Sequence, residues 1–193
     1  MFIKDWKKEI FTIPNLLSLF RLVLIPLYVV IYLNAEEPGE YFLAGAILAV
    51  SCLTDAIDGK VARHFNMIST VGKILDPLAD KLTQFTLTFC LSLKYPILNP
   101  VLCLFVIKEV FQLIAGIVNL RRGKMLPGAL MAGKICTTVL FISLIALVLF
   151  PDMDPMLVDG IALVDTVFLV ISFVSYILAY FGKNTKVQDL EQK

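Results

Sequence analysis

The feature that most constrains this chain is a series of long apolar runs. Six runs are close to the 20 or so residues that a helix needs to cross the hydrocarbon core of a bilayer. They cover residues 13–33, 41–57, 72–94, 98–120, 129–150 and 160–181. Backbone groups inside a bilayer must be paired within a helix or a closed barrel, and these runs lack the alternating pattern of barrel strands. We therefore expect an all-α membrane protein with six transmembrane helices.

Composition agrees with a membrane protein. Of the 193 residues, 59% are hydrophobic, whereas soluble domains contain about 45–50% apolar residues. No linker, low-complexity stretch or internal repeat divides the sequence, so a single domain over residues 1–193 is expected. A net charge of +1 argues against a nucleic-acid partner. The cysteines lack metal-ligand spacing and are expected to be small apolar side chains: Cys52, Cys90, Cys103 and Cys136.

Lysine and arginine gather in alternate connections, which predicts the orientation of the chain in the membrane. Twelve of them fall in the first set of connections and the termini: Lys4, Lys7, Lys8, Lys60, Arg63, Lys73, Arg121, Arg122, Lys124, Lys183, Lys186 and Lys193. The opposite connections contain only Lys94. Because basic connections stay in the cytoplasm, we expect both termini of this multi-pass protein to be cytoplasmic.

Charged residues also occur inside the predicted spans. They are Arg21, Lys81, Lys108, Lys134, Asp55, Asp58, Asp76, Asp80, Glu109 and Asp165. A charge at the centre of a bilayer costs about 2.5–3.5 kcal/mol, so such residues normally face the interior of the bundle. Most lie near the cytoplasmic ends of their spans, which predicts a water-filled cavity open to the cytoplasm.

The sequence does not settle the roles of three of these charged residues. Arg21 is expected either to bind a phosphate or nucleotide or to neutralise an acid such as Glu109. Glu109 itself is expected to pair with a basic neighbour. Asp165 is expected to make a polar contact at a helix end near the outer face.

Four carboxylates carry the most specific signal. Asp55 and Asp58 are three residues apart, and Asp76 and Asp80 are four apart, so each pair shares a helix face. Converging carboxylates cannot all stay ionised in a low-dielectric site without cations. All-oxygen ligands favour Mg²⁺ or Mn²⁺, and two ions are expected to clamp phosphoryl oxygens. Gly59 allows close backbone approach to such a group.

The same residues resemble a known signature. Asp55-x-x-Asp58-Gly59-x-x-Ala62-Arg63, followed after eight residues by Gly72-x-x-x-Asp76-x-x-x-Asp80, is similar to the CDP-alcohol phosphotransferase motif at every defined position. The resemblance implies that Asp55, Asp58, Asp76 and Asp80 bind the metal ions. It further implies that Asp80 is the general base and that the family's homodimer forms. The nucleotide-binding residues implied are Asp55, Gly59, Ala62, Arg63, Asn15 and Ser69.

Within that family the chain looks most like bacterial phosphatidylglycerophosphate synthases. The segments that carry this likeness are Pro14-Asn15-Leu16-Leu17-Ser18-Leu19-Phe20-Arg21, Asp76-Pro77-Leu78-Ala79-Asp80-Lys81 and Gly133-Lys134. The implied substrates are CDP-diacylglycerol and sn-glycerol 3-phosphate, at the cytoplasmic face of a bacterial cytoplasmic membrane. Lys81, Lys108 and Lys134 would bind the acceptor phosphate. Lys108-Glu109 departs from the usual Arg-Glu of that group, which makes phosphate capture less assured.

Other functions stay open on the sequence alone. A cardiolipin synthase-type enzyme would use phosphatidylglycerol as the acceptor, and other members of the family use other alcohols. Outside the enzymes, intramembrane carboxylates also occur in cation-coupled transporters. Transporters place them near the midplane, whereas these four lie at a cytoplasmic edge beside a basic connection.

Overall fold

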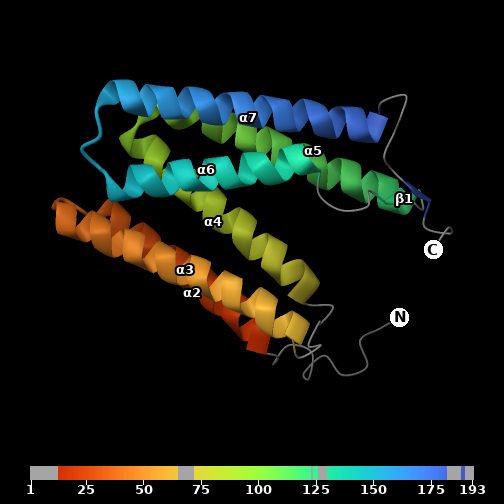
Figure 1. The fold of residues 1–193 in the computed structure, drawn as a ribbon, viewed down its shortest axis with the longest axis horizontal. Coiled ribbons are helices and arrows are strands. Elements are labelled where there is room, and N and C mark those ends of the chain that lie inside the picture. Colours follow the sequence, from red (N-terminus) through yellow and green to blue (C-terminus); the bar gives the residue numbers. More distant parts are fainter. Residues whose placement is uncertain (1–12, 65–71, 123, 126–129, 182–187, 190–193) are drawn as a thin grey trace. The chain divides into compact units, whose positions relative to one another are not determined.

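The computed structural model describes residues 13–64, 72–122, 124–125, 130–181 and 188–189. Side chains at 13–14, 55–64, 72–74, 124–125 and 188–189 fall outside that description. The described chain is helical apart from one short strand pair (Figure 1). Its α-helices are α2 (Ile13–Leu33), α3 (Pro38–His64), α4 (Gly72–Lys94), α5 (Asn99–Arg121), α6 (Met131–Leu149) and α7 (Pro155–Phe181).

A short 3₁₀ helix and two strands complete the described elements. The 3₁₀ helix η1 (Pro96–Leu98) directly precedes α5. Strands β1 (Lys124–Met125) and β2 (Gln188–Asp189) pair antiparallel, with Lys124 opposite Asp189. This pairing joins the end of the chain to the connection between α5 and α6.

The helices occur where the apolar runs predict them. The bounds of α2 and α4 match the predicted runs, whereas α3 and α7 start earlier than their apolar residues do. Both early starts place proline at the first helical position, where its missing N–H costs nothing. At α7, Asp154 caps the helix, because its Oδ1 accepts a hydrogen bond of 2.8 Å from the N–H of Met156.

Four of the described helical segments are long and apolar enough to cross a membrane. They are Asn15–Leu33, Pro96–Arg121, Met131–Leu149 and Pro155–Phe181. The apolar part of α3, Pro38–Thr54, is shorter. Charged residues interrupt the beginning of α4, at Asp76, Asp80 and Lys81. The six-span count and the cytoplasmic termini therefore stay predictions.

The chain divides into two compact units. Unit 1 comprises residues 1–90 and 148–151, and unit 2 comprises residues 91–147 and 152–193. In unit 1, α2 packs along α3, as Figure 1 shows. In unit 2, α5 packs against α7, and Phe111 of α5 meets the ring of Phe173 edge-on at 5.2 Å between centroids.

Each unit has a buried helix face with a regular spacing. In unit 2, α7 buries residues at alternating steps of four and three: Val158, Ala162, Asp165, Leu169, Ser172, Tyr176 and Ala179. In unit 1, α2 buries Leu24, Tyr28 and Tyr32. Tyr28 and Tyr32 stack at 5.5 Å, and Tyr41 of α3 meets Tyr32 edge-on at 5.6 Å. An aromatic cluster thus closes one end of the α2–α3 pair.

Candidate active site

The buried face of α2 changes character along the helix. Toward its C-terminus this face is apolar and aromatic, but toward its N-terminus it buries Asn15, Ser18 and Arg21. These polar residues recur every three positions, so each lies next to the following one on the helix surface. Arg21 is only 2% exposed. A buried arginine needs anionic partners, and the structure supplies them from α4.

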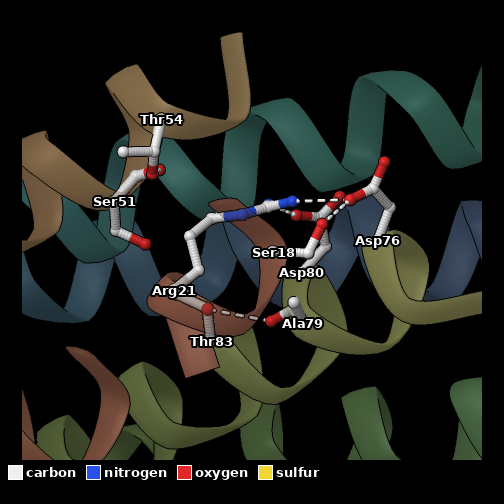
Figure 2. A network of polar contacts seen from close by, with 8 residues as sticks. All are labelled: Ser18, Arg21, Ser51, Thr54, Asp76, Ala79, Asp80 and Thr83. Atoms are coloured by element: carbon white, nitrogen blue, oxygen red, sulfur yellow. Dashed lines mark hydrogen bonds and ion pairs between the residues drawn. The ribbon is translucent and has the colours of Figure 1, made fainter. Parts of the chain in front are cut away.

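Arg21 binds two carboxylates through two different nitrogens. Nη1 donates to Asp80 Oδ1 at 2.6 Å, and Nη2 donates to Asp76 Oδ1 at 3.0 Å. Ser18 adds a second contact from α2, since its hydroxyl also donates to Asp76 Oδ1. Figure 2 shows the guanidinium directed toward both acids. Ser18 and Arg21, here called the α2 clamp, therefore join α2 to the start of α4.

The spacing of Asp76 and Asp80 explains why a single arginine can hold both. Residues four apart project from the same helix face about one turn from each other. A guanidinium presents several N–H donors in a planar fork and can reach both, whereas a lysine offers a single charged nitrogen. The sequence predicts this shared face, and the structure confirms it for the Asp76–Asp80 pair.

The two carboxylates remain partly open to solvent. Their side chains are 40% and 51% exposed, while Arg21, which binds both, is buried. Arg21 thus binds two carboxylates that reach an accessible surface of unit 1. On the other side of Asp80, Ala79 is fully buried and Thr83 returns its hydroxyl to the Ala79 carbonyl at 2.9 Å. Burial of Ala79 on one side of α4 thus leaves Asp76 and Asp80 on a side that reaches solvent.

The remaining predicted ligands cannot be placed. Asp55, Asp58, Gly59, Ala62 and Arg63 belong to the backbone of α3, but their side chains lie outside the described residues. Ser69 lies outside them entirely. Among the side chains that the structure does describe, no group of three or more metal-ligating residues occurs. Convergence of all four aspartates therefore stays a prediction.

The donors around Asp76 and Asp80 fit a hard divalent cation. Carboxylate and hydroxyl oxygens are the ligands that Mg²⁺ and Mn²⁺ prefer. Both acids also reach solvent, from which an ion could enter. Figure 2 shows the second oxygen of Asp76 directed away from Arg21, so it can serve another partner. These residues could hold part of a metal site.

The residues predicted to bind the acceptor phosphate have different surroundings. Lys81 follows Asp80 in unit 1 and is half-buried. Lys134 is exposed at the start of α6 in unit 2. Lys108, also in unit 2, is 2% exposed, and its Nζ lies 2.5 Å from Glu109 Oε1 and 5.8 Å from the centre of the Phe105 ring. Glu109 therefore pairs with a basic neighbour, Lys108, as expected.

The expectation for Asp165 was wrong. Asp165 lies ten residues inside α7 rather than at a helix end, and it is 1% exposed. Neither carboxylate oxygen makes a hydrogen bond of normal geometry, although the hydroxyl of Ser143 in α6 is close enough to interact. The heptad-like spacing of α7 turns Asp165 inward with its apolar neighbours, and apolar patterning alone gave no sign of that.

Sequence reasoning did not identify Ser18 as a site residue. Its hydroxyl contacts the same Asp76 oxygen as Arg21 does. The available signal was the three-residue recurrence of Asn15, Ser18 and Arg21, which predicts one polar helix face.

Comparison with known proteins agrees with this arrangement. The family model for CDP-alcohol phosphatidyltransferase matches residues 11–179, which include α2 with its clamp, the signature residues and nearly all of α7. The chain belongs to the CDP-alcohol phosphatidyltransferase family. Its assignment as a membrane-bound transferase of phospholipid synthesis follows from that membership.

Similar members of the CDP-alcohol phosphatidyltransferase family include glycerol-3-phosphate phosphatidyltransferases and cardiolipin synthases. A CDP-diacylglycerol–glycerol-3-phosphate 3-phosphatidyltransferase of Aquifex aeolicus is 33% identical over 174 residues, covering 88% of this chain and 96% of the relative. The Bacillus subtilis protein of the same name is 41% identical, covering 37% of this chain and 43% of the relative. A cardiolipin synthase (CMP-forming) of Streptomyces coelicolor is 43% identical, covering 38% and 35%.

Proposed function

We propose that this protein transfers the phosphatidyl group of CDP-diacylglycerol to sn-glycerol 3-phosphate, giving phosphatidylglycerophosphate and CMP. The observation that carries the proposal is the acidic face of α4, where Asp76 and Asp80 stand one turn apart at a solvent-accessible surface inside the family's signature. The near full-length match to the Aquifex transferase supports glycerol 3-phosphate as the acceptor.

In the proposed reaction, a hydroxyl oxygen of the acceptor attacks the β-phosphorus of CDP-diacylglycerol. The bond between that phosphorus and the oxygen bridging to the α-phosphate breaks, and CMP leaves with the bonding electrons. Asp80 takes the proton from the acceptor hydroxyl and releases it to solvent. Asp55, Asp58, Asp76 and Asp80 would hold two divalent ions, which supply charge neutralisation for the phosphoryl oxygens when bound.

Protein residues supply the remaining roles. Asn15, Gly59, Ala62, Arg63 and Ser69 would line the nucleotide pocket. Lys81, Lys108 and Lys134 would supply positive charge to the acceptor phosphate. Because Lys108 is already paired with Glu109, exposed Lys134 is the better placed of the two unit 2 lysines to receive an incoming anion.

The proposed setting is a bacterial cytoplasmic membrane. The chain would cross it six times as a homodimer, with both termini and the active site at the cytoplasmic face. The distribution of lysine and arginine supports this orientation. Lipid tails would enter the site laterally from the bilayer.

The cardiolipin synthase relatives favour a second candidate, in which phosphatidylglycerol is the acceptor. An acceptor panel separates the candidates. The purified protein, with CDP-diacylglycerol and Mg²⁺ or Mn²⁺, is given glycerol 3-phosphate, phosphatidylglycerol, inositol phosphate or serine, and CMP release is measured. We expect release with glycerol 3-phosphate. Release only with phosphatidylglycerol would establish the second candidate, and no release with any acceptor would leave a non-enzymatic role such as cation-coupled transport.

Asp80→Asn tests the role of the proposed base. The amide keeps the shape of the side chain but cannot accept a proton, so turnover should be abolished. Metal-dependent binding of CDP-diacylglycerol, measured by equilibrium binding, should be partly retained. Full activity in this variant would remove Asp80 from the base role.

A further inference from the structure

The α2 clamp makes contacts that a purely structural arginine would not need. Arg21 does not meet one acid in a simple pair but gives one nitrogen to each of two signature aspartates. Ser18 adds a hydroxyl contact to Asp76. Each of these hydrogen bonds ends on an Oδ1 atom, so the clamp holds one oxygen of each carboxylate.

Fixing one edge of a carboxylate also fixes where its other oxygen points. Figure 2 shows this for Asp76, whose second oxygen faces away from the guanidinium. Residues that hydrogen-bond metal ligands from behind orient them, and removing such partners typically weakens metal affinity about 10–100-fold. The clamp contacts residues that the proposed function makes metal ligands.

We propose that Arg21 is a positioning residue of this site. It acts with Ser18 to hold Asp76 and Asp80 in the orientation from which they bind divalent ions. The inference rests on the proposed function only in requiring that these two aspartates are metal ligands. It goes beyond the signature, because both clamp residues lie on α2, more than fifty residues before the acids they hold.

Charge and geometry predict opposite effects when Arg21 is changed. A positive charge beside a divalent ion repels it, so loss of that charge alone would tighten metal binding. Loss of the fork would instead release the two carboxylates and weaken metal binding. Arg21→Lys keeps the charge and removes the fork, so it isolates the geometric effect. Arg21→Gln removes both.

The matched control is Tyr28→Phe. Tyr28 lies two turns further along α2 on the same buried face, and it is also 2% exposed. Its hydroxyl has no hydrogen-bond partner among the described residues. The substitution therefore alters a buried α2 side chain without touching the acids.

The first readout is Mn²⁺ binding to the detergent-solubilised full chain without substrates, followed by electron paramagnetic resonance. We expect Arg21→Lys to weaken Mn²⁺ binding about tenfold. Tyr28→Phe should match the unmodified protein. The second readout is CMP release as a function of Mn²⁺. The half-saturating concentration should rise in Arg21→Lys by a similar factor.

Three results would overturn the proposal. One is unchanged or tighter Mn²⁺ binding in folded Arg21→Lys. Another is a lower melting temperature with an unaltered Mn²⁺ midpoint, which would make Arg21 a structural residue. The third is a raised KM for CDP-diacylglycerol with normal Mn²⁺ binding, which would make it a substrate contact.

A smaller change keeps the test available if the Arg21 variants fail to fold. Ser18→Ala removes the other clamp contact without leaving a buried charge, and it should also weaken Mn²⁺ binding. Unchanged binding in that variant would count against the clamp. Because binding is measured without substrates, loss of the proposed transferase activity would leave this result interpretable. If the unmodified protein released CMP but bound no Mn²⁺, the inference would fail while the proposed function would stand.

Discussion

Gly133 gives the sharpest packing prediction in unit 2. It lies in α6 where that helix approaches Tyr176 of α7. A Cβ atom at this position would lie 2.6 Å from Tyr176 Oη, 2.9 Å from Cε2 and 3.1 Å from Cζ. The ring is buried and stacks on Tyr180 at 6.5 Å between centroids, so it has little room to rotate away. Gly133→Ala should therefore force the two helices apart.

The expected magnitude follows from two opposing effects. Overpacking a buried contact costs about 1–3 kcal/mol. Replacing glycine by alanine inside a helix stabilises the helix by about 1 kcal/mol, because alanine has the higher helix propensity. Gly160→Ala in α7 is the matched control, because a Cβ there meets nothing within 4 Å. The difference in unfolding free energy between the two variants isolates the clash, and it should be about 1–3 kcal/mol.

The assay is unfolding of the detergent-solubilised protein, by heat or by denaturant, for both alanine variants. A third protein, Gly133→Ala with Tyr176→Phe, removes the shortest of the three contacts and should recover part of the loss. Equal stability of Gly133→Ala and Gly160→Ala would refute the reasoning. So would a double variant that is less stable than Gly133→Ala alone.

The remaining predictions concern three charged residues. Asp165→Asn should raise stability, because burying an ionised carboxylate beside only the Ser143 hydroxyl costs more than burying a neutral amide; loss of CMP release in a stable variant would instead show a functional role. The backbone N–H groups of Glu36 and Glu37 bind the Glu40 carboxylate and lower its pKa. The ionised carboxylate therefore stabilises the folded protein above the unfolded pKa of about 4.3. This stabilisation is lost as the pH falls through the lower pKa of the folded protein. Glu40→Gln should remove that acid-dependent part of the melting temperature, and a melting curve with the same pH dependence in both proteins would contradict this. Lys134→Ala should raise KM for glycerol 3-phosphate and leave kcat nearly unchanged, and an unaltered KM would exclude Lys134 from acceptor binding.

Apolar patterning located the helices well but located some of their ends poorly. The ends of α2 and α4 coincide with the ends of apolar runs, so those bounds were predictable. The start of α7 is marked by the cap Asp154 and by Pro155 at the first helical position, and a search for apolar residues detects neither. A search for caps would have found that start.

The site was predictable within one helix and not between helices. Spacing alone placed Asp76 and Asp80 on one face of α4. No spacing rule links Arg21 to residues more than fifty positions later, so its partners remained open until the structure was known. Asp165 shows the converse, because its burial depends on packing of α7 within unit 2.

The account depends on divalent ions bound by the signature carboxylates. The most direct measurement is an experimental structure of the protein with Mn²⁺, in which anomalous scattering locates the ions. We predict Mn²⁺ in contact with carboxylate oxygens of Asp76 and Asp80 from α4 and of Asp55 and Asp58 from α3, with Arg21 still bound to the α4 pair. Ions bound elsewhere, or α3 aspartates turned away from Asp76 and Asp80, would contradict the account.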